Sequence, residues 1–155
     1  MKKIEMVDLR SQYERLKADI DSAVAGVISS TAFIKGPDVR LFEEDLQRYL
    51  GIRHVISCAN GTDALQIAMM ALGLKPGDEV ITTNFTFIAT VEVIELLGLK
   101  TVLVEPEPGT FNISPDAIRK AITPRTRAIV PVHLFGQCAD MEQITAMAQQ
   151  HGSHI

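Results

Sequence analysis

The sequence predicts an α/β fold in which a mostly parallel sheet carries helices on both faces. From residue 54 onward, short runs of β-branched and apolar residues alternate with longer runs at helical spacing. The short runs are apolar throughout, which is typical of parallel strands buried on both faces. With 155 residues, the chain is long enough for one domain with a substantial core.

Two amphipathic helices are expected before this alternation begins. Asp8 is placed to cap the first, and the apolar face of that helix carries Tyr13, Leu16, Ile20, Val24 and Val27. Pro37 occupies the first position of the second helix, and Gly51 ends it. We therefore divide the chain into an N-terminal helical segment, residues 1–52, and an α/β domain, residues 53–155.

Five strands are expected in the second part, the last of them only begun. They cover residues 54–58, 80–83, 101–104, 127–132 and 153–155. Helices are expected at residues 62–72, 87–97, 114–122 and 140–150. Residues 75–78 (Lys-Pro-Gly-Asp) have the pattern of a type II turn.

The first strand, turn and helix of this series predict a seat for an anion. Asn60 and Gly61 tolerate the sharp turn, and the helix start beyond them has unpaired N–H groups. Gly61 leaves these groups accessible, the Thr62 hydroxyl adds a donor, and the Asp63 carboxylate must point away from a bound phosphate. The unit alone identifies no ligand, because neither the P-loop nor the three-glycine dinucleotide pattern is present.

Composition and charge exclude several classes of partner. A net charge of −4 gives no electrostatic reason to expect nucleic acid or an anionic membrane. The start of the chain has no apolar segment of a signal peptide, and no apolar run approaches the length of a membrane span. Cys58 and Cys138 form no CxxC pattern, so we expect two free thiols in a reducing cytoplasm and no metal site.

In parallel α/β sheets, ligands bind at the carboxyl ends of the strands. This rule selects the loops at residues 59–62, 84–87, 105–107 and 133–137. The first loop has the anion seat, the second has aromatic residues, and the fourth has a histidine and an amide. A phosphate seat next to an aromatic face suits a flat, phosphorylated ring.

Seven segments together resemble the DegT/DnrJ/EryC1/StrS sugar aminotransferases, which are pyridoxal-phosphate enzymes of the aspartate-aminotransferase fold. They are Leu9, Ile34–Pro37 (IKGP), Cys58–Leu65 (CANGTDAL), Leu74–Ile81 (LKPGDEVI), Thr86–Thr90 (TFIAT), Ile122–Thr126 (ITPRT) and Pro131–Gly136 (PVHLFG). The resemblance covers essentially the whole chain. It implies an incomplete large domain of the fold-type I pyridoxal-phosphate transferases, truncated at its C-terminal side.

The resemblance also implies roles for individual residues. Gly61, Thr62 and Asp63 match the turn that holds the phosphate of pyridoxal 5'-phosphate, and Phe87 matches the aromatic residue that stacks on its ring. His133 and Gln137 fall in the loop beside cofactor and substrate. From the residues alone, Phe87 can instead be a core residue that opens a helix. His133 and Gln137 can equally be a satisfied pair at the end of a loop.

The family's catalytic residues have no counterpart here, so we assign none. The aspartate that pairs with the pyridine nitrogen, and the lysine that binds the cofactor covalently, follow the last matching segment. Transamination requires an amine nucleophile and an electron sink, so we expect the 155-residue chain by itself to be inactive. The full-length parent would be a homodimer that transfers an amino group from glutamate to a nucleotide-linked keto-sugar.

The substrate expectation rests on a subgroup. Residues 56–67 and 136–140 look most like enzymes that act on UDP-3-keto-sugar uronates in surface-polysaccharide synthesis. Three alternatives remain open. The chain can be a non-catalytic module that binds a phosphate or a nucleotide sugar, a fragment of a pyridoxal-phosphate sugar dehydratase, or a fragment without function.

Overall fold

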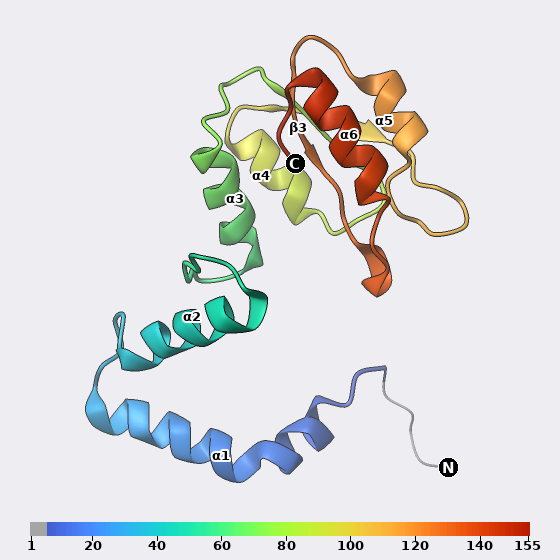
Figure 1. Ribbon diagram of the computed structural model, residues 1–155. Coiled ribbons are helices and arrows are strands. Elements are labelled where there is room, and N and C mark those ends of the chain that lie inside the picture. The colour runs from blue at the N-terminus through green and yellow to red at the C-terminus, as the bar shows by residue number, and fades with distance from the viewer. Residues whose placement is uncertain (1–5) are drawn as a thin grey trace, which may run out of the picture. The chain divides into compact units, whose positions relative to one another are not determined.

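The computed structural model describes residues 6–155, which separate into two compact units (Figure 1). The first unit extends to Ser57, and the second runs from Cys58 to Ile155. The sequence places the division between its two parts after residue 52, and that boundary stays a prediction. The first unit is helical, and the second contains the sheet.

The first unit consists of α1 (Leu9–Ser30) and α2 (Pro37–Leu50). Asp8 caps α1 as predicted, because its carboxylate accepts a hydrogen bond from the Ser11 N–H at 3.0 Å. Gly51 ends α2 with a φ of 66°, a left-handed conformation that glycine adopts without strain. Local capping chemistry therefore sets the bounds of both helices.

Gly36 and the apolar face of α1 are the two notable features of this unit. A Cβ on Gly36 would lie 2.3 Å from the Ala32 carbonyl oxygen, so only glycine fits where the chain enters α2. Neither helix contains a buried residue. The exposed apolar side chains of α1 recur at helical spacing: Leu9, Tyr13, Leu16, Ile20, Val24 and Ile28.

The strand expected at residues 54–58 is not formed, so this prediction was wrong. Ile56 is 81% exposed, and the Ser57 N–H donates to the Glu43 side chain at 2.9 Å instead of to a strand carbonyl. An apolar, β-branched run becomes a strand only where a neighbouring strand completes its hydrogen bonds. None of the described residues does so here.

The second unit is built on three parallel strands, which confirms the predicted α/β class. β1 (Glu79–Thr83) lies between β2 (Lys100–Val104) and β3 (Thr126–Val130). The strand expected to begin near residue 153 is present as a single parallel bridge from His154 to Ala128. It extends the sheet beyond β3, where the His154 N–H donates to the Arg127 carbonyl at 2.8 Å.

Helices cover both faces of this sheet, as predicted (Figure 1). On one face, Ile81 and Ile129 pack with buried residues of α5 (Pro115–Ala121) and α6 (Met141–His151). On the other, Val80 and Ala128 pack with α3 (Gly61–Ala71) and α4 (Ala89–Leu96). Adjacent strand residues point to opposite faces, which is why an apolar run fills both cores.

Two element boundaries differ from the sequence expectation. The helix expected from residue 87 begins at Ala89, so Phe87 lies in the loop before it. The strand expected to reach residue 132 ends at Val130, because Pro131 has no N–H to donate to a ladder. Within residues 6–155, no helix is both long enough and apolar enough to span a membrane.

Candidate functional site

The candidate site begins at the turn into α3. Asn60 caps this helix: its side-chain oxygen accepts from the Asp63 N–H at 3.0 Å, and its amide nitrogen donates to the Asp63 carboxylate at 3.2 Å. This reciprocal pair holds the Asp63 carboxylate against Asn60. The side chain is therefore turned to its own cap rather than to an incoming anion.

The two residues between Asn60 and Asp63 leave donors free. Among residues 6–155, the N–H groups of Gly61 and Thr62 have no hydrogen-bond partner. A Cβ built on Gly61 would meet no atom within 4 Å, so the helix start is uncrowded on the Cα side of Gly61. Backbone N–H groups at a helix start, together with the positive end of the helix dipole, favour a bound phosphate.

A cavity of about 530 Å³ opens next to this helix start. Three segments of the second unit line it: the start of α3, the β1–α4 loop with the first residues of α4, and the end of β3 with the residues that follow it. The lining residues are Gly61, Thr62, Leu65, Thr86, Phe87, Ala89, Thr90, Val130, Pro131, Val132 and His133. The cavity therefore lies at the carboxyl ends of β1 and β3, and its size is within the range of small-molecule sites.

Phe87 forms an apolar, aromatic part of this cavity wall. Its side chain is 75% exposed, which is inconsistent with a core residue that opens a helix. The neighbouring aromatic residue, Phe85, is instead paired with Phe111, with ring centroids 5.3 Å apart. Phe87 thus keeps a free aromatic surface at the cavity, which a flat ring can cover.

His133 lines the same cavity from the end of β3. Its Nδ1 accepts a hydrogen bond from the Ala139 N–H at 3.2 Å. An imidazole nitrogen that accepts carries no proton, so the neutral ring has its hydrogen on Nε2. His133 is therefore a hydrogen-bond donor through Nε2.

The structure does not bring every predicted residue to the cavity. Gly61, Thr62, Phe87 and His133 line it together, whereas Asp63 faces its cap. Gln137 lies outside and borders a separate cavity of about 330 Å³. The 3₁₀ turn η1 (Leu134–Gly136), with positive φ angles at Phe135 and Gly136, redirects the chain between His133 and Gln137.

Thr86 and Thr90 lie in segments already singled out from the sequence, but neither they nor Asn112 were predicted as site residues. Thr86 and Thr90 contribute hydroxyl-bearing residues to the wall on either side of Ala89. Asn112 is only 5% exposed, and its side chain contacts the backbone at Leu134, Gln137 and Cys138. No local pattern reveals these long-range contacts, although a threonine pair flanking the predicted helix start was a usable signal for the wall.

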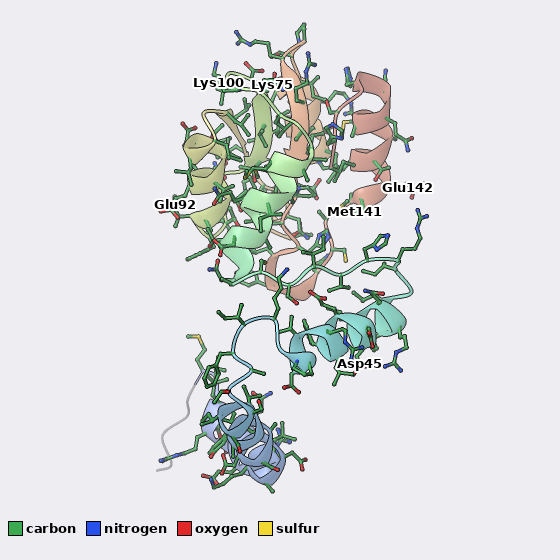
Figure 2. The ribbon with its side chains drawn as sticks, turned by 90° about the vertical axis from the view of Figure 1, so that its left-hand side faces the viewer. Asp45, Lys75, Glu92, Lys100, Met141 and Glu142 are labelled. Carbon is green, nitrogen blue, oxygen red and sulfur yellow. The ribbon has the colours of Figure 1, made fainter. Side chains whose placement is uncertain are left out.

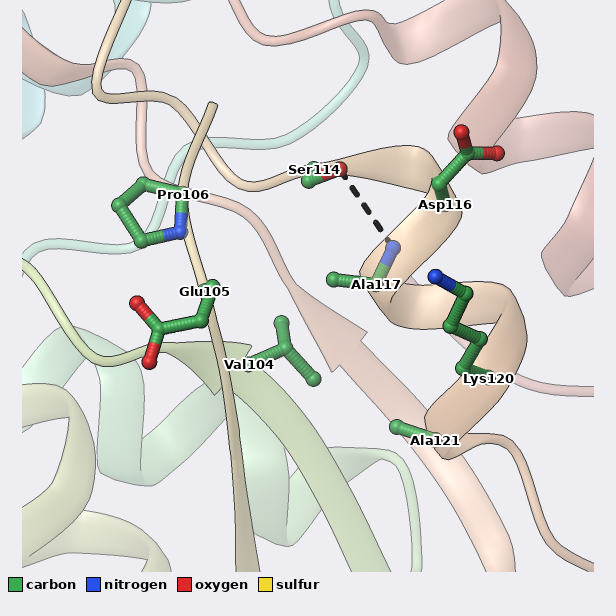
Figure 3. Close-up of a pocket in the computed structure, with 8 residues that line it drawn as sticks. All are labelled: Val104, Glu105, Pro106, Ser114, Asp116, Ala117, Lys120 and Ala121. Carbon is green, nitrogen blue, oxygen red and sulfur yellow. Dashed lines mark hydrogen bonds between the residues drawn. The ribbon is translucent and has the colours of Figure 1, made fainter. Parts of the chain in front are cut away.

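A second cavity, of about 450 Å³, lies between the end of β2 and α5 (Figure 3). Two of its polar residues already have structural roles. The Ser114 hydroxyl accepts from the Ala117 N–H at 3.4 Å and caps α5, and Asp116 pairs with Arg119. Glu105 and Lys120 complete its polar lining, which contains no residue of α3 (Figure 3). We assign it no chemistry.

The residues around the first cavity fit a phosphorylated aromatic ring. Free N–H groups at Gly61 and Thr62 suit a phosphate, and the exposed face of Phe87 suits the ring. The donor on His133 suits an acceptor oxygen.

Comparison with known sequences gives this arrangement a family. The sequence pattern of the DegT/DnrJ/EryC1/StrS aminotransferase family matches residues 14–155. The chain belongs to this family. The resemblance seen in the sequence is thereby confirmed, and so is the expected relation to the pyridoxal-phosphate transferase fold.

Named relatives in the DegT/DnrJ/EryC1/StrS family include sugar aminotransferases. A UDP-2-acetamido-2-deoxy-3-oxo-D-glucuronate aminotransferase of Pseudomonas aeruginosa is 50% identical over 149 residues, which are 96% of this chain and 42% of that protein. A dTDP-3-amino-3,4,6-trideoxy-alpha-D-glucose transaminase of Streptomyces venezuelae is 40% identical over 99% of this chain and 40% of its own length. The chain thus spans about two fifths of these relatives.

Solved structures agree with the sequence comparison. The crystal structure of S. venezuelae DesV in complex with a ketimine intermediate matches 100% of this chain and 42% of that chain, with a TM-score of 0.96 and 40% identity. NtdA of Bacillus subtilis, solved with the bound cofactor PMP, matches 88% of this chain and 31% of that chain, with a TM-score of 0.85 and 41% identity. The predicted cofactor, pyridoxal 5'-phosphate, is thereby confirmed for the family.

Proposed function

We propose that the cavity between α3, the β1–α4 loop and the end of β3 binds pyridoxal 5'-phosphate. The Gly61 and Thr62 N–H groups and the Thr62 hydroxyl would hold the phosphate, and Phe87 would cover one face of the ring. The observation that carries this proposal is the convergence of Gly61, Thr62, Phe87 and His133, from three separate segments, on one cavity. Asp63 takes part indirectly, because it fixes the turn through Asn60.

We propose that the whole protein is an aminotransferase acting on a nucleotide-linked keto-sugar, with glutamate as amino donor. The 50% identity to a UDP-3-oxo-glucuronate enzyme supports a UDP-3-keto-sugar uronate as substrate. When bound, pyridoxal phosphate supplies an electron-withdrawing ring that stabilises negative charge on the reacting carbon. The residues of this chain bind and orient: they hold the phosphate, limit ring movement and present one imidazole donor.

We further propose that this chain binds the cofactor without turning over substrate. None of the lysines among residues 6–155 lines the cavity, so the described wall contains no amine to bond with the cofactor or to move a proton. The same observation favours a second candidate function, a non-catalytic module that binds a phosphate or a nucleotide sugar. The two candidate functions differ in whether binding requires the pyridine ring of the cofactor.

Association into a homodimer is also part of the proposal. The exposed apolar side chains along α1 supply a surface of the kind that is covered in assemblies. Light scattering after size exclusion would then give twice the mass of the chain, and Ile20→Glu would return the mass to that of one copy. A single-copy mass for the unchanged chain would contradict this part of the proposal.

Binding is tested with pyridoxamine 5'-phosphate, which has no aldehyde to react with surface lysines. We expect saturable binding by the full chain, followed by the fluorescence of the ring. Pyridoxamine without phosphate is expected to bind at least about tenfold more weakly, because the charge-assisted bonds to the helix start are lost. Equal affinity for inorganic phosphate and the cofactor would favour the non-catalytic module, and no saturable binding would contradict both.

The absence of turnover is tested separately with pyridoxal 5'-phosphate. The absorption spectrum is recorded before and after borohydride, and the reduced protein is mapped for modified lysines. We expect no modification at one defined lysine. Stoichiometric trapping on a single lysine would mean that another residue supplies the amine, and the proposed inactivity would then be wrong.

A further inference from the structure

We propose that Asn112 is a positioning residue, which holds the loop after β3 so that His133 presents its Nε2–H to the cavity. This inference rests on the proposed function of that cavity. The two residues are far apart in sequence, and Asn112 does not line the cavity. Its role would be exerted entirely through the segment at residues 133–138.

The side chain of Asn112 makes three hydrogen bonds to this segment. Its amide nitrogen donates to the carbonyls of Gln137 at 3.1 Å and Cys138 at 3.2 Å. Its amide oxygen accepts from the Leu134 N–H at 3.0 Å. The pattern uses both donors and the acceptor of a carboxamide, so no other side chain of similar size can reproduce it.

Asn112 is itself fixed by its surroundings. The side chain is buried, its N–H donates to the Thr110 hydroxyl at 3.2 Å, and its carbonyl accepts from the Glu107 N–H at 2.8 Å. The preceding residue, Phe111, has a φ of 60° and packs its ring against Phe85. A non-glycine residue keeps such a backbone only where neighbouring contacts hold it there.

The segment held by Asn112 determines the state of His133. The η1 turn brings the Ala139 N–H back to the Nδ1 of His133 at 3.2 Å. This bond fixes the neutral tautomer with its hydrogen on Nε2. His133 is the one titratable side chain among the residues that line the cavity. Asn112 therefore sets both where this ring lies and which of its atoms can donate.

The Nε2–H of His133 determines which kind of ligand atom this residue can bind. An Nε2–H can bond to an acceptor oxygen, such as a phenolic, phosphate or carboxylate oxygen of the ligand in the cavity. The hydroxyl of Thr62 can donate as well as accept, but its position on α3 does not depend on Asn112. Loss of the Asn112 contacts should therefore weaken the His133 bond to ligand and leave the phosphate seat unchanged.

The first test is made on the unchanged chain without ligand, and a variant serves only to assign its signals. Long-range ¹H–¹⁵N NMR of the full chain at neutral pH reports which imidazole nitrogen carries hydrogen, and His133→Ala assigns the signals among the four histidines. We expect His133 to be almost entirely the Nε2–H tautomer. A ring protonated on Nδ1, or one that averages between tautomers, would overturn the proposal.

The second test is a double-mutant cycle on the dissociation constant for pyridoxamine 5'-phosphate. Asn112→Asp keeps the shape and the acceptor but loses both donors. We expect Asn112→Asp and His133→Ala each to raise the dissociation constant about tenfold, and the double variant to raise it by no more than either alone. Multiplying effects would show that Asn112 acts independently of His133 and would overturn the proposal.

A matched control and a separate readout complete the design. Gln150→Glu makes the same amide-to-acid change on the exposed surface of α6 and is expected to leave binding and tautomer unchanged. Asn112→Asp is also expected to lose the tautomer preference of His133. If the unchanged chain does not bind the probe, the proposed function fails, while the tautomer measurements still decide the role of Asn112.

Discussion

The amino and carboxyl ends of the three parallel strands differ in whether their polar groups already have partners. Lys75, in the turn before β1, and Lys100, the first residue of β2, lie toward the amino end of the sheet, whereas Met141 and Glu142 at the start of α6 lie toward the other end (Figure 2). The amino end is closed by side chains that satisfy one another. The carboxyl end is open, with free N–H groups and a cavity of about 530 Å³.

Glu79 is the centre of the closed end. It is 2% exposed, and it accepts from Thr123 at 2.5 Å and from Arg125 at 2.6 and 3.0 Å. Lys100 approaches to 3.6 Å. The Thr123 hydroxyl, followed by the Arg125 guanidinium, holds the pKa of Glu79 below its ordinary value. The group is therefore ionised, paired and unavailable for chemistry.

This difference indicates that contacts at the amino end of the sheet stabilise the fold, whereas polar groups at the carboxyl end are available to bind a ligand. Polar groups at the amino end are saturated by contacts between residues more than 40 positions apart, which ties β1 to the segment before β3. Polar groups at the carboxyl end are left for a ligand. Substitutions at the first end should change the free energy of unfolding, and substitutions at the second should change ligand affinity.

The largest expected effect is on stability at the closed end. Glu79→Gln should lower the free energy of unfolding by about 2 kcal/mol, because the neutral amide cannot replace a buried, charge-assisted acceptor. The exposure of Arg125 and Lys100 moderates this value. Urea denaturation measures it, with Glu92→Gln on the exposed surface of α4 as the control (Figure 2). Equal midpoints for the two variants would contradict the assignment of stability to this end.

The next effect is on affinity at the open end. Phe87→Ala should raise the dissociation constant for pyridoxamine 5'-phosphate about tenfold, because the ring loses its stacking surface. The midpoint of unfolding should hardly change, since the side chain is mostly exposed. Phe33→Ala removes another exposed phenylalanine that is outside the cavity lining and should change neither quantity. A large loss of stability in Phe87→Ala would instead support the alternative that Phe87 is a core residue.

A smaller effect is expected from the hydroxyl at the phosphate seat. Thr62→Val keeps the shape of the side chain and should weaken binding about fivefold, or about 1 kcal/mol, because one donor to the phosphate is lost. Thr145→Val, at a half-buried position of α6, is the matched control. Titration with pyridoxamine, which has no phosphate, should show no difference between Thr62→Val and the unchanged chain. A difference there would place Thr62 at another part of the ligand.

The stability that Glu79 contributes should depend on pH. Because folding lowers the pKa of Glu79, its contribution to stability is fully present above the ordinary glutamate pKa. The contribution is lost as pH falls through the lowered value. The gap in unfolding free energy between the unchanged chain and Glu79→Gln should therefore be constant near neutral pH and narrow in acid. A gap that widens in acid would mean that folding raises the pKa instead.

Sequence reasoning was most successful where the physics is local. The caps Asp8 and Asp140 each bond to the N–H group three residues ahead, at 3.0 Å in both helices. Gly77, with a φ of 88°, and the bond from the Asp78 N–H to the Lys75 carbonyl form the predicted turn. The free helix start at Gly61 also follows from neighbouring residues. Such contacts span three or four positions, so residue type and spacing predict them.

By itself, then, the sequence determined the α/β class, the order of the α-helices and of the three strands between them, most of their ends and the family. Only the tertiary structure decided that residues 54–58 form no strand, that Phe87 is free of the core and that Gln137 lies outside the cavity. It also decided the burial of Glu79 and the contacts of Asn112. These outcomes depend on which distant groups complete a hydrogen bond or cover a side chain, and packing brings those groups together.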